Sequence, residues 1–412
     1  MPIRILHFAD VHIGMENFGK LNPETGLSSR IHDFLLRMDD ITDYARVEEA
    51  DLIVFAGDAF KTATPNPTFQ RAFATRIKEL SLIAPVILLV GNHDLQPNSS
   101  KASSIEIYST LDVPNVLVAE TFDVHEVTTR NGRVIVGTAP YPIRARLMEQ
   151  IDSTSKTIRE MDDQLQDSLY TTLDQLATQA DEMAGDDPRL LIGHFTVTGA
   201  KYGSERGIML GKDVAVGLGA LADPRWDYVA LGHIHKHQNL TAGRKDVPPV
   251  VYSGSVERID FGEERDEKGF CWIQLERGNT VWDFVPLAAR PMRTLSVDCR
   301  TDKQPTDTLL KLIKSENLRE AIVRIRVDLT AETDALLRDD KVREALRDAG
   351  VYHIAAIEHR LERQERIRLG ASPEGLTPEE LLERFLSNKG YNNSEKETLM
   401  ALAVGLMAND NG

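Results

Sequence analysis

The chain has 412 residues, of which 42% are hydrophobic, and its formal net charge at pH 7 is −16. Because this length exceeds that of one ordinary domain, we expect two or three domains, each with a core of its own. The negative charge argues against a protein that coats nucleic acid through a general basic surface, so a phosphodiester substrate must be held locally. The two cysteines form neither a Cys-x-x-Cys metal pair nor a disulfide framework.

The N-terminal residues lack the basic region, apolar stretch and cleavage site of a signal peptide. No apolar run approaches the roughly 18 residues that a membrane-spanning helix needs. We therefore expect a soluble, cytoplasmic protein without a membrane partner. Cys271 and Cys299 lie in apolar, strand-like surroundings, which predicts buried free thiols in a reducing compartment.

The first 287 residues show the alternation of strands and helices that is typical of an α/β domain. Up to about residue 120, β-type runs alternate with helical patterns over 31–47 and 67–82, which indicates βαβ units. Apolar residues recur every three or four positions over 155–183, which predicts a long helix packed on the sheet. Further strands are expected at 189–192, 227–231, 250–252, 269–275 and 280–285.

A boundary near residues 286–291 precedes a second, smaller domain. Strand patterns at 293–297, 321–327 and 351–359 flank helical patterns at 306–315 and 331–349. These elements predict a small α+β domain over 291–360. Because it carries no cluster of ligand-type residues, we expect it to shape access to a site rather than to supply chemistry.

The last segment, 361–412, is predicted to be a helical hairpin. Thr377-Pro378-Glu379-Glu380 carries an N-cap threonine, a proline in the first turn and a glutamate three residues on, which marks a helix start. The apolar positions of the two helices are Leu381, Leu382, Phe385, Leu386, Leu399, Leu402, Leu406 and Met407. So small an element lacks a sufficient core. We expect it to dock on another protein, and docking on its own chain is the alternative.

Five β-type runs each end in a turn that carries an Asp, Asn or His residue. The turns are Asp10-Val11-His12, Gly57-Asp58, Gly91-Asn92-His93-Asp94, Gly193-His194 and Gly232-His233-Ile234-His235. Side chains at the carboxyl ends of parallel strands converge on one crevice in α/β folds. Any one of these turns alone is most often an ordinary solvent-exposed turn, but the five in this order predict a metal site.

The five turns supply enough ligands for a pair of divalent ions about 3.5–4 Å apart. We assign one ion to Asp10, His12 and His235, and the other ion to Asn92, His194 and His233. Asp58 is assigned as the bridging ligand, since a carboxylate has two oxygens. Imidazole, amide and carboxylate ligands without thiolate favour two Mn²⁺ ions, and Fe²⁺, Zn²⁺ and Mg²⁺ are the alternatives.

His93 follows a predicted ligand and would face the side of the site that has no ligands. A protonated imidazole there could stabilise the scissile phosphate or the leaving oxyanion, which makes His93 the predicted catalytic residue. Asp94 is predicted to support the site as an acceptor that orients that ring or its neighbour. The cations predicted to hold the substrate are Lys61, Lys101, Lys201 and Arg206.

With these motifs in this order, the chain resembles the SbcD family, the nuclease subunits of SbcCD complexes that repair DNA double-strand breaks, within the calcineurin-like metallophosphoesterase superfamily. Phosphatases and cyclic-nucleotide phosphodiesterases share the metal motifs, so the likeness to SbcD depends on the segment from Tyr252 to Glu264 and on the domain and hairpin beyond it. The resemblance implies a metallophosphoesterase β-sandwich flanked by helices over 1–287, a capping domain over 291–360 and a C-terminal helix-loop-helix over 361–412.

The resemblance also implies an activity and partners. It implies a manganese-dependent DNA nuclease for repair and recombination, acting as a 3′-to-5′ exonuclease on double-stranded DNA ends and as an endonuclease on single strands and hairpins. The family works as a homodimer, formed through helices of the nuclease domain, with an SbcC-type, SMC-like ATPase whose coiled coil the terminal hairpin binds. The ligands assigned above, and His93 as the catalytic histidine, are carried over position by position.

One departure from the family is Lys61, where relatives often have His or Asp. This departure leaves the cleavage polarity open. A small-molecule phosphodiesterase or phosphatase of the same superfamily is one alternative. A non-catalytic tethering subunit of an ATPase complex is another.

Overall fold

The computed structural model describes residues 1–24, 26–96, 101–143, 158–203, 214–362, 380, 382–383, 386–387 and 396–403. The chain falls into two compact units. The larger comprises 1–295, 309–325 and 339–357, and the smaller comprises 296–308, 326–338 and 358–412. The three domains predicted at 1–287, 291–360 and 361–412 follow a different division and stay predictions.

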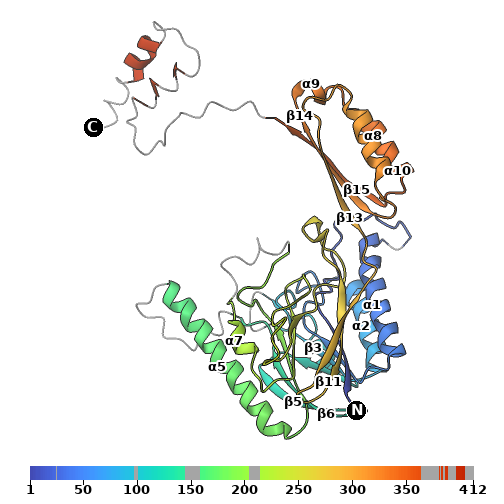
Figure 1. The fold of residues 1–412 in the computed structure, drawn as a ribbon, viewed down its shortest axis with the longest axis vertical. Helices are drawn as coiled ribbons and strands as arrows, with labels where there is room; N and C mark the ends of the chain where they lie inside the picture. Colours follow the sequence, from blue (N-terminus) through green and yellow to red (C-terminus); the bar gives the residue numbers. More distant parts are fainter. Residues whose placement is uncertain are drawn as a thin grey trace. The chain divides into compact units, whose positions relative to one another are not determined.

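The larger unit contains two six-stranded sheets (Figure 1). The strands of the first sheet are β1 (Ile3–Phe8), β2 (Leu52–Phe55), β3 (Val86–Leu89), β4 (Val116–Ala119), β11 (Gly269–Leu275) and β12 (Val281–Pro286). They lie in the order β12-β11-β1-β2-β3-β4, with β1 to β4 parallel and with β11 antiparallel to both of its neighbours. β2 and β3 are apolar and buried at every position, as expected for parallel strands covered on both faces.

The second sheet has the order β5-β6-β7-β8-β10-β9. Its strands are β5 (Asp123–Thr129), β6 (Gly132–Ala139), β7 (Arg189–His194), β8 (Tyr228–Gly232), β9 (Gln238–Asn239) and β10 (Val250–Tyr252). The four central strands are parallel, and the edge strands β5 and β9 are antiparallel to their neighbours. The hairpin of β5 and β6 is not among the strands expected from the sequence.

The two sheets pack face to face, and alternation along the strands builds this core. Ile5, Val54 and Ile87 point into the layer between the sheets, where they meet residues of the second sheet such as Val136 and Ile192. Their chain neighbours point to the opposite face, as the two-residue period of a strand requires. These neighbours are Leu6, Ile53 and Leu88.

Helices cover the outer faces of the sandwich. α1 (Ser29–Val47) and α2 (Pro67–Ser81) pack on the first sheet, and α5 (Ile158–Ala184) packs on the second (Figure 1). Asn66 caps α2, because its side chain accepts a hydrogen bond from the Thr68 N–H and Pro67 follows in the first turn. The short helices are α3 (Ile107–Thr110), α7 (Leu218–Leu221) and the 3₁₀-helix η1 (Phe261–Glu263). The predicted fold class, a β-sandwich flanked by helices, is confirmed.

A third sheet has the strand order β13-β14-β15, with bounds Met292–Asp298, Ile322–Leu329 and His353–Leu361. The accompanying helices are α8 (Pro305–Ser315), α9 (Ala331–Asp334) and α10 (Asp339–Asp348). The single helix predicted over 331–349 is therefore wrong. Thr306 explains the break, because its hydroxyl donates to the Leu336 carbonyl (3.2 Å) and accepts from the Arg338 N–H (3.1 Å), which occupies the backbone groups between the two helices.

The structure describes the C-terminal segment only at residues 380, 382–383, 386–387 and 396–403, all of which are helical. Leu386 is buried there and Leu402 is exposed. Of the predicted apolar positions, Leu381, Phe385, Leu406 and Met407 lie outside the described residues. Both cysteines are buried and free. In the part of the chain that is described, no helix combines the length and apolarity needed to cross a membrane.

Candidate metal centre

Four of the seven predicted ligands have a left-handed backbone. The φ angles are 54° at Asp10, 48° at His12, 64° at Asp58 and 94° at His233. Residues other than glycine rarely adopt φ above zero, and such strain is concentrated at functional sites. Hydrogen bonds between turns hold this conformation, for example from the His12 N–H to the Asp58 carbonyl at 3.1 Å. The turns after β1 and β2 are thereby fixed to each other.

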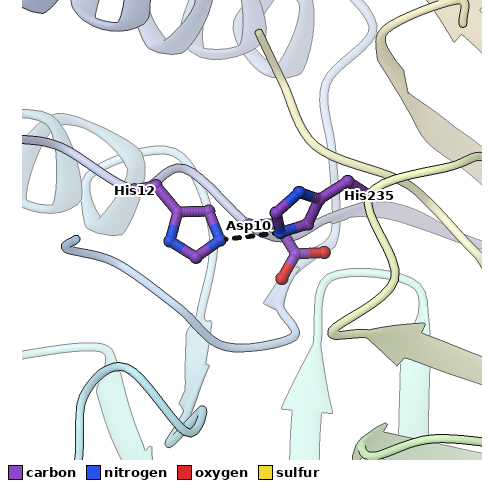
Figure 2. Close-up of side chains that lie close together, drawn as sticks. All are labelled: Asp10, His12 and His235. Atoms are coloured by element: carbon purple, nitrogen blue, oxygen red, sulfur yellow. Dashed lines mark hydrogen bonds between the residues drawn. The ribbon is translucent and has the colours of Figure 1, made fainter. Parts of the chain in front are cut away.

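The first predicted ligand group, Asp10, His12 and His235, comes together at the ends of β1 and β8 (Figure 2). Its ligand atoms lie within 4.8 Å of one another, and the Nε2 atoms of the two histidines are 3.0 Å apart. The Asp10 carboxylate accepts the N–H of His233 with both oxygens, at 3.0 and 3.1 Å. His235 Nδ1 is 2.9 Å from Glu263 Oε1, so its Nε2 is directed at the other two ligands.

The second predicted group, Asn92, His194 and His233, comes together in the same way. Asn92 Oδ1 lies 3.0 Å from His194 Nε2 and 2.8 Å from His233 Nδ1. His194 Nδ1 lies 2.7 Å from the Ala56 carbonyl oxygen. Since a carbonyl can only accept, His194 carries a proton on Nδ1, and in its neutral form it presents the lone pair of Nε2 to the group.

Asp58 lies between the two groups. Its Oδ2 is 3.6 Å from His12 Nε2 and 3.4 Å from His194 Nε2, and its Oδ1 accepts the His93 N–H at 2.8 Å. Burial raises the pKa of Asp58, but the imidazoles of His194 and His93 outweigh that effect and hold the pKa well below its usual range. An ionised carboxylate therefore faces ligand atoms of both groups, which is the geometry that a bridging ligand needs.

The chemistry of this donor set fits a pair of divalent cations. Burial lowers the pKa of His12 well below its usual value, which favours the neutral imidazole that a metal requires. Burial raises the pKa of Asp10 to about 6, and the Asp58 carboxylate, opposing burial, raises the pKa of His194 to about 9. Divalent cations bind the deprotonated forms of both groups, so loading the site with metal would release protons.

Asp94 supports the site through the backbone. Its carboxylate accepts hydrogen bonds from the N–H groups of Asp58 (3.0 Å), Gly91 (3.0 Å) and Ala59 (3.2 Å) and from the Ser104 hydroxyl (2.9 Å). The sequence predicts instead that Asp94 orients the ring of His93 or a neighbour. In the structure these bonds join the turn after β2 to the turn after β3, and so they position Asp58 and Asn92 together.

Two glycines are required because other ligand atoms occupy the space where a side chain would lie. A Cβ atom at Gly57 would come within 2.3 Å of His194 Nδ1, and one at Gly91 would come within 2.2 Å of Asp58 Oδ1. Gly57 also has φ of 98°, which other residues rarely adopt. Both residues let the strand ends approach closely enough for their ligands to meet.

His93 is half-buried beside the first group, with its ring centroid 4.8 Å from that of His12. Its Nδ1 is 2.9 Å from the Lys61 carbonyl oxygen, so Nδ1 carries the proton and Nε2 can contact another molecule. His93 also forms, with His12 and Asp58, a group whose ligand atoms lie within 4.8 Å of one another. Geometry alone therefore allows His93 either to bind metal or to contact a substrate.

The predicted substrate-binding cations have different positions. Lys61, Lys101 and Lys201 are exposed, and Lys61 is next to His93 through its carbonyl group. The backbone of Lys201 is bonded to the side chain of Gln238 in β9, shortly after the predicted ligand His235. Arg206 lies outside the described residues.

The sequence alone assigns no role to two residues that contact the site. Glu263 is fully buried against His235, and it belongs to the segment that carries the family resemblance, but nothing in its spacing marks it as a partner of that histidine. Tyr141 places its ring centroid 5.6 Å from that of His233 and 6.4 Å from that of His194. It follows β6, and a correct prediction of that strand would have placed Tyr141 at the same sheet edge as the ligands.

Comparisons with known proteins agree with this geometry. Residues 3–237, more than half of the chain, match the family model for calcineurin-like phosphoesterases. The D subunit of the nuclease SbcCD from Bacillus subtilis (strain 168) is 28% identical over 295 residues, which cover 70% of this chain and 70% of that protein. The likeness to SbcD that the motifs indicate is thus confirmed.

Solved structures also resemble the chain. A dimetal phosphatase from Danio rerio is 14% identical with a TM-score of 0.41, and the match covers 69% of this chain and 97% of that one. A purple acid phosphatase from yellow lupin seeds is 13% identical with a TM-score of 0.39, over 69% of this chain and 52% of that one.

Proposed function

Since the chain belongs to the calcineurin-like phosphoesterase family and is therefore a metal-dependent phosphoesterase, we propose that it is a DNA nuclease of the SbcD type. The observation that carries this proposal is the convergence of two ligand groups on the ionised carboxylate of Asp58. The relative from Bacillus subtilis, part of a nuclease, supports DNA as the substrate. The chain's own net charge of −16 gives no independent support for a nucleic-acid substrate.

The proposed ligands are Asp10, His12 and His235 for the first ion, Asn92, His194 and His233 for the second, and Asp58 for both. The absence of thiolate and the mixture of imidazole, amide and carboxylate favour Mn²⁺, with Fe²⁺, Zn²⁺ and Mg²⁺ as alternatives. When bound, such cations polarise a phosphoryl oxygen and activate water.

The proposed catalytic residue is His93. The Lys61 carbonyl holds its Nδ1, so the ring presents Nε2 toward incoming substrate. A protonated Nε2 can donate to the scissile phosphate and pass its proton to the leaving 3′ or 5′ oxygen. Asp94 acts indirectly, because its four hydrogen bonds position Asp58 and the turn that carries His93.

We propose double-stranded DNA ends as substrates of a 3′-to-5′ exonuclease activity, and single strands and hairpins as substrates of an endonuclease activity. The chain's net charge is −16, so the contacts to the DNA backbone must be few and local. Lys61, next to His93, is the proposed cation nearest to the chemistry, and Lys101, Lys201 and Arg206 are proposed to contact the strand farther out.

The proposed partner is an SbcC-type, SMC-like ATPase, bound by the C-terminal hairpin at 361–412. The name of the relative, a component of SbcCD, supports this proposal. Leu402 in the helical stretch 396–403 is 63% exposed, which leaves an apolar side chain free for a partner surface. Such a complex serves DNA repair and recombination.

A second copy of this chain is the other proposed partner. Leu82, Ile107 and Leu111 are exposed at the ends of α2 and α3, where they line a mainly apolar cavity of about 510 Å³. Exposed apolar clusters of this kind mark protein interfaces. Leu111→Arg should convert a homodimer into a monomer in sedimentation equilibrium, and a monomeric wild-type chain would contradict the proposal.

Cleavage assays on different substrates distinguish the proposal from its alternatives. The chain, loaded with Mn²⁺, is given linear duplex, single-stranded and hairpin DNA labelled at either end, beside p-nitrophenyl phosphate and cyclic nucleotides. The proposal expects rapid cleavage of DNA, with end labels reporting the polarity, and Asp58→Asn serves as the inactive control. Preference for the small phosphoesters would identify a phosphatase or a small-molecule phosphodiesterase, and no cleavage of any substrate would indicate a tethering subunit.

A further inference from the structure

Arg290 lies just before β13 and is held from several sides. Its Nε and Nη2 donate to the two oxygens of Asp33 at 2.7 and 2.6 Å, and its Nη1 donates to the Glu320 carboxylate at 3.1 Å. The guanidinium carbon lies 3.6 Å from the ring centroid of Tyr352. A bidentate carboxylate on one side and a stacked ring on another fix the orientation of an arginine.

The backbone around Arg290 is bonded to residues 257–264. The Arg290 N–H donates to both oxygens of the buried Glu257, at 3.1 and 3.0 Å. Farther along β13, the Thr294 N–H donates to Glu264 Oε1 at 2.9 Å. The segment 257–264 is therefore held near both of its ends by the stretch from Arg290 to Thr294.

The same segment reaches a predicted ligand of the first ion. Glu263 Oε1 is 2.9 Å from His235 Nδ1, and Glu263 Oε2 accepts the Ile259 N–H at 3.0 Å. Lys268 Nζ lies 2.8 Å from Glu263 Oε2 and donates to the His235 carbonyl at 3.0 Å. Glu263 thus positions the ring of His235 directly. It also positions the backbone of His235 indirectly, through Lys268.

A second contact leads from the same place to the turn that carries His12. Phe261, Met292 and Ile322 form a small buried cluster on which Phe18 packs, with the ring centroids of Phe18 and Phe261 5.2 Å apart. The Arg324 guanidinium lies 4.2 Å from the Phe261 ring. Phe18 follows His12 by six residues, so the same cluster also packs on the segment that comes after this histidine.

Two of the three ligands of the second group are fixed from elsewhere in the sandwich. His194 is oriented by the Ala56 carbonyl at the end of β2, and Asn92 is in the turn that Asp94 holds. His233 is held by Asp10 and lies in the same turn as His235, so Asn92 and His194 are the ligands of the second ion whose orientation depends on other parts of the chain.

We propose that Arg290 is a positioning residue for the first of the two ions, because its clamp on Asp33, Tyr352 and Glu257 holds residues 257–264 and thereby Glu263 and His235. This inference rests on the ligand assignment proposed above. Loosening the clamp weakens binding of the first ion and leaves the second unchanged.

The experiment is a calorimetric titration of the metal-free full-length chain with Mn²⁺, which resolves two binding steps. His235→Ala identifies the step that belongs to the first ion. Arg290→Ala and Glu263→Gln should each weaken that step by about 10- to 100-fold, the usual effect of removing a group that orients a ligand, and leave the other step unchanged. The double variant should lose no more than the stronger single variant, because both changes act along one path.

Arg76→Ala is the matched control. The side chains of Arg76 and Arg290 are each 16% exposed, and each is paired with an aspartate of α1. Arg76 itself belongs to α2, and its partner Asp39 lies farther along α1 than Asp33. Arg76→Ala should leave both steps unchanged. Arg290→Lys keeps the charge but loses the bidentate contact with Asp33, so it should weaken the first step by an intermediate amount. This variant tests the role of Arg290 if Arg290→Ala does not fold.

The results that would overturn the inference are distinguishable from failure of the proposed function. A wild-type chain that binds fewer than two Mn²⁺ ions would overturn the ligand assignment and the inference together. If the wild-type chain binds two Mn²⁺ ions, two results would overturn the role of Arg290 alone. One is a first binding step that is unchanged in Arg290→Lys, and the other is an equal weakening of both steps in the Arg290 variants.

Discussion

His7 offers a quantitative test of how burial acts in this sandwich. It lies in β1, its side chain is 0% exposed, and within the described part of the chain neither ring nitrogen makes a hydrogen bond of normal geometry. Burial lowers its pKa to about 3, and an interaction with the backbone of Leu231 offsets only part of that effect. In the unfolded chain the pKa of His7 is near 6.5. Between pH 6.5 and pH 3 the unfolded chain therefore binds a proton at His7, whereas the folded chain does not.

The sign of the pH dependence follows from this difference. Because the unfolded state binds more protons, the free energy of unfolding falls as the pH falls through this window, and His7 contributes its full stability only above pH 6.5. The loss from this residue is about 2 kcal/mol at pH 5 and roughly 5 kcal/mol at pH 3, at about 1.4 kcal/mol per pH unit. His7→Leu removes the titrating group. Between pH 7.5 and pH 5, its free energy of unfolding should therefore fall by about 2 kcal/mol less than that of the wild type.

Urea unfolding of the metal-free chain at the two pH values measures this difference. His32→Leu, the same substitution at an exposed position of α1, is the control. Equal losses of stability in the wild type and in His7→Leu would refute the reasoning, since they would show that the folded state accommodates the charged imidazole.

Three further changes test the site and the partner surface. His93→Ala should retain two bound Mn²⁺ ions but lose cleavage by about 10²- to 10⁴-fold, whereas Asp58→Ala should lose both, and metal analysis beside a nuclease assay distinguishes them. Gly57→Ala should displace His194 and lower the free energy of unfolding by more than about 1 kcal/mol, because its Cβ has no room and its φ is 98°; an unchanged melting temperature and metal content would contradict this. Leu402→Asp should weaken co-purification with an SbcC-type ATPase while the melting temperature of the free chain stays unchanged, and the opposite pattern would mean that the hairpin packs on its own chain.

The sequence predicted which side chains come together better than it predicted the residues that position them. Asp10, Asp58 and His194 come at the ends of apolar runs, so the strand pattern alone places them at the carboxyl ends of strands, where the two sheets bring them together. Glu263 and Tyr141 reach the same place through the packing of segments whose local pattern carries no such signal. Contacts between distant residues cannot be read from periodicity.

The break between α9 and α10 has the same origin. The residues over 331–349 have the period of one helix, and the hydroxyl that interrupts it comes from Thr306, far away in the chain. In β5 only one residue of seven is buried, so its sequence lacked the apolar pattern that marked the other strands. Elements that depend on a remote side chain or on an edge position are therefore the ones that the sequence does not determine locally.

The separation of the ligands along the chain has a consequence for synthesis on the ribosome. The first hundred residues contain Asp10, His12, Asp58 and Asn92, together with the hydrogen bonds of Asp94 that join their turns. His235, which lies beside His12 in the folded chain, comes 223 positions after it. Chains emerge N-terminal end first, at about 5–20 residues per second, so the first part of the site leaves the ribosome many seconds before the last histidines. During that interval the nascent chain presents the carboxylates of Asp10 and Asp58 with the imidazoles of His12 and His93, and the other three histidines of the site arrive only when β7 and β8 have been made.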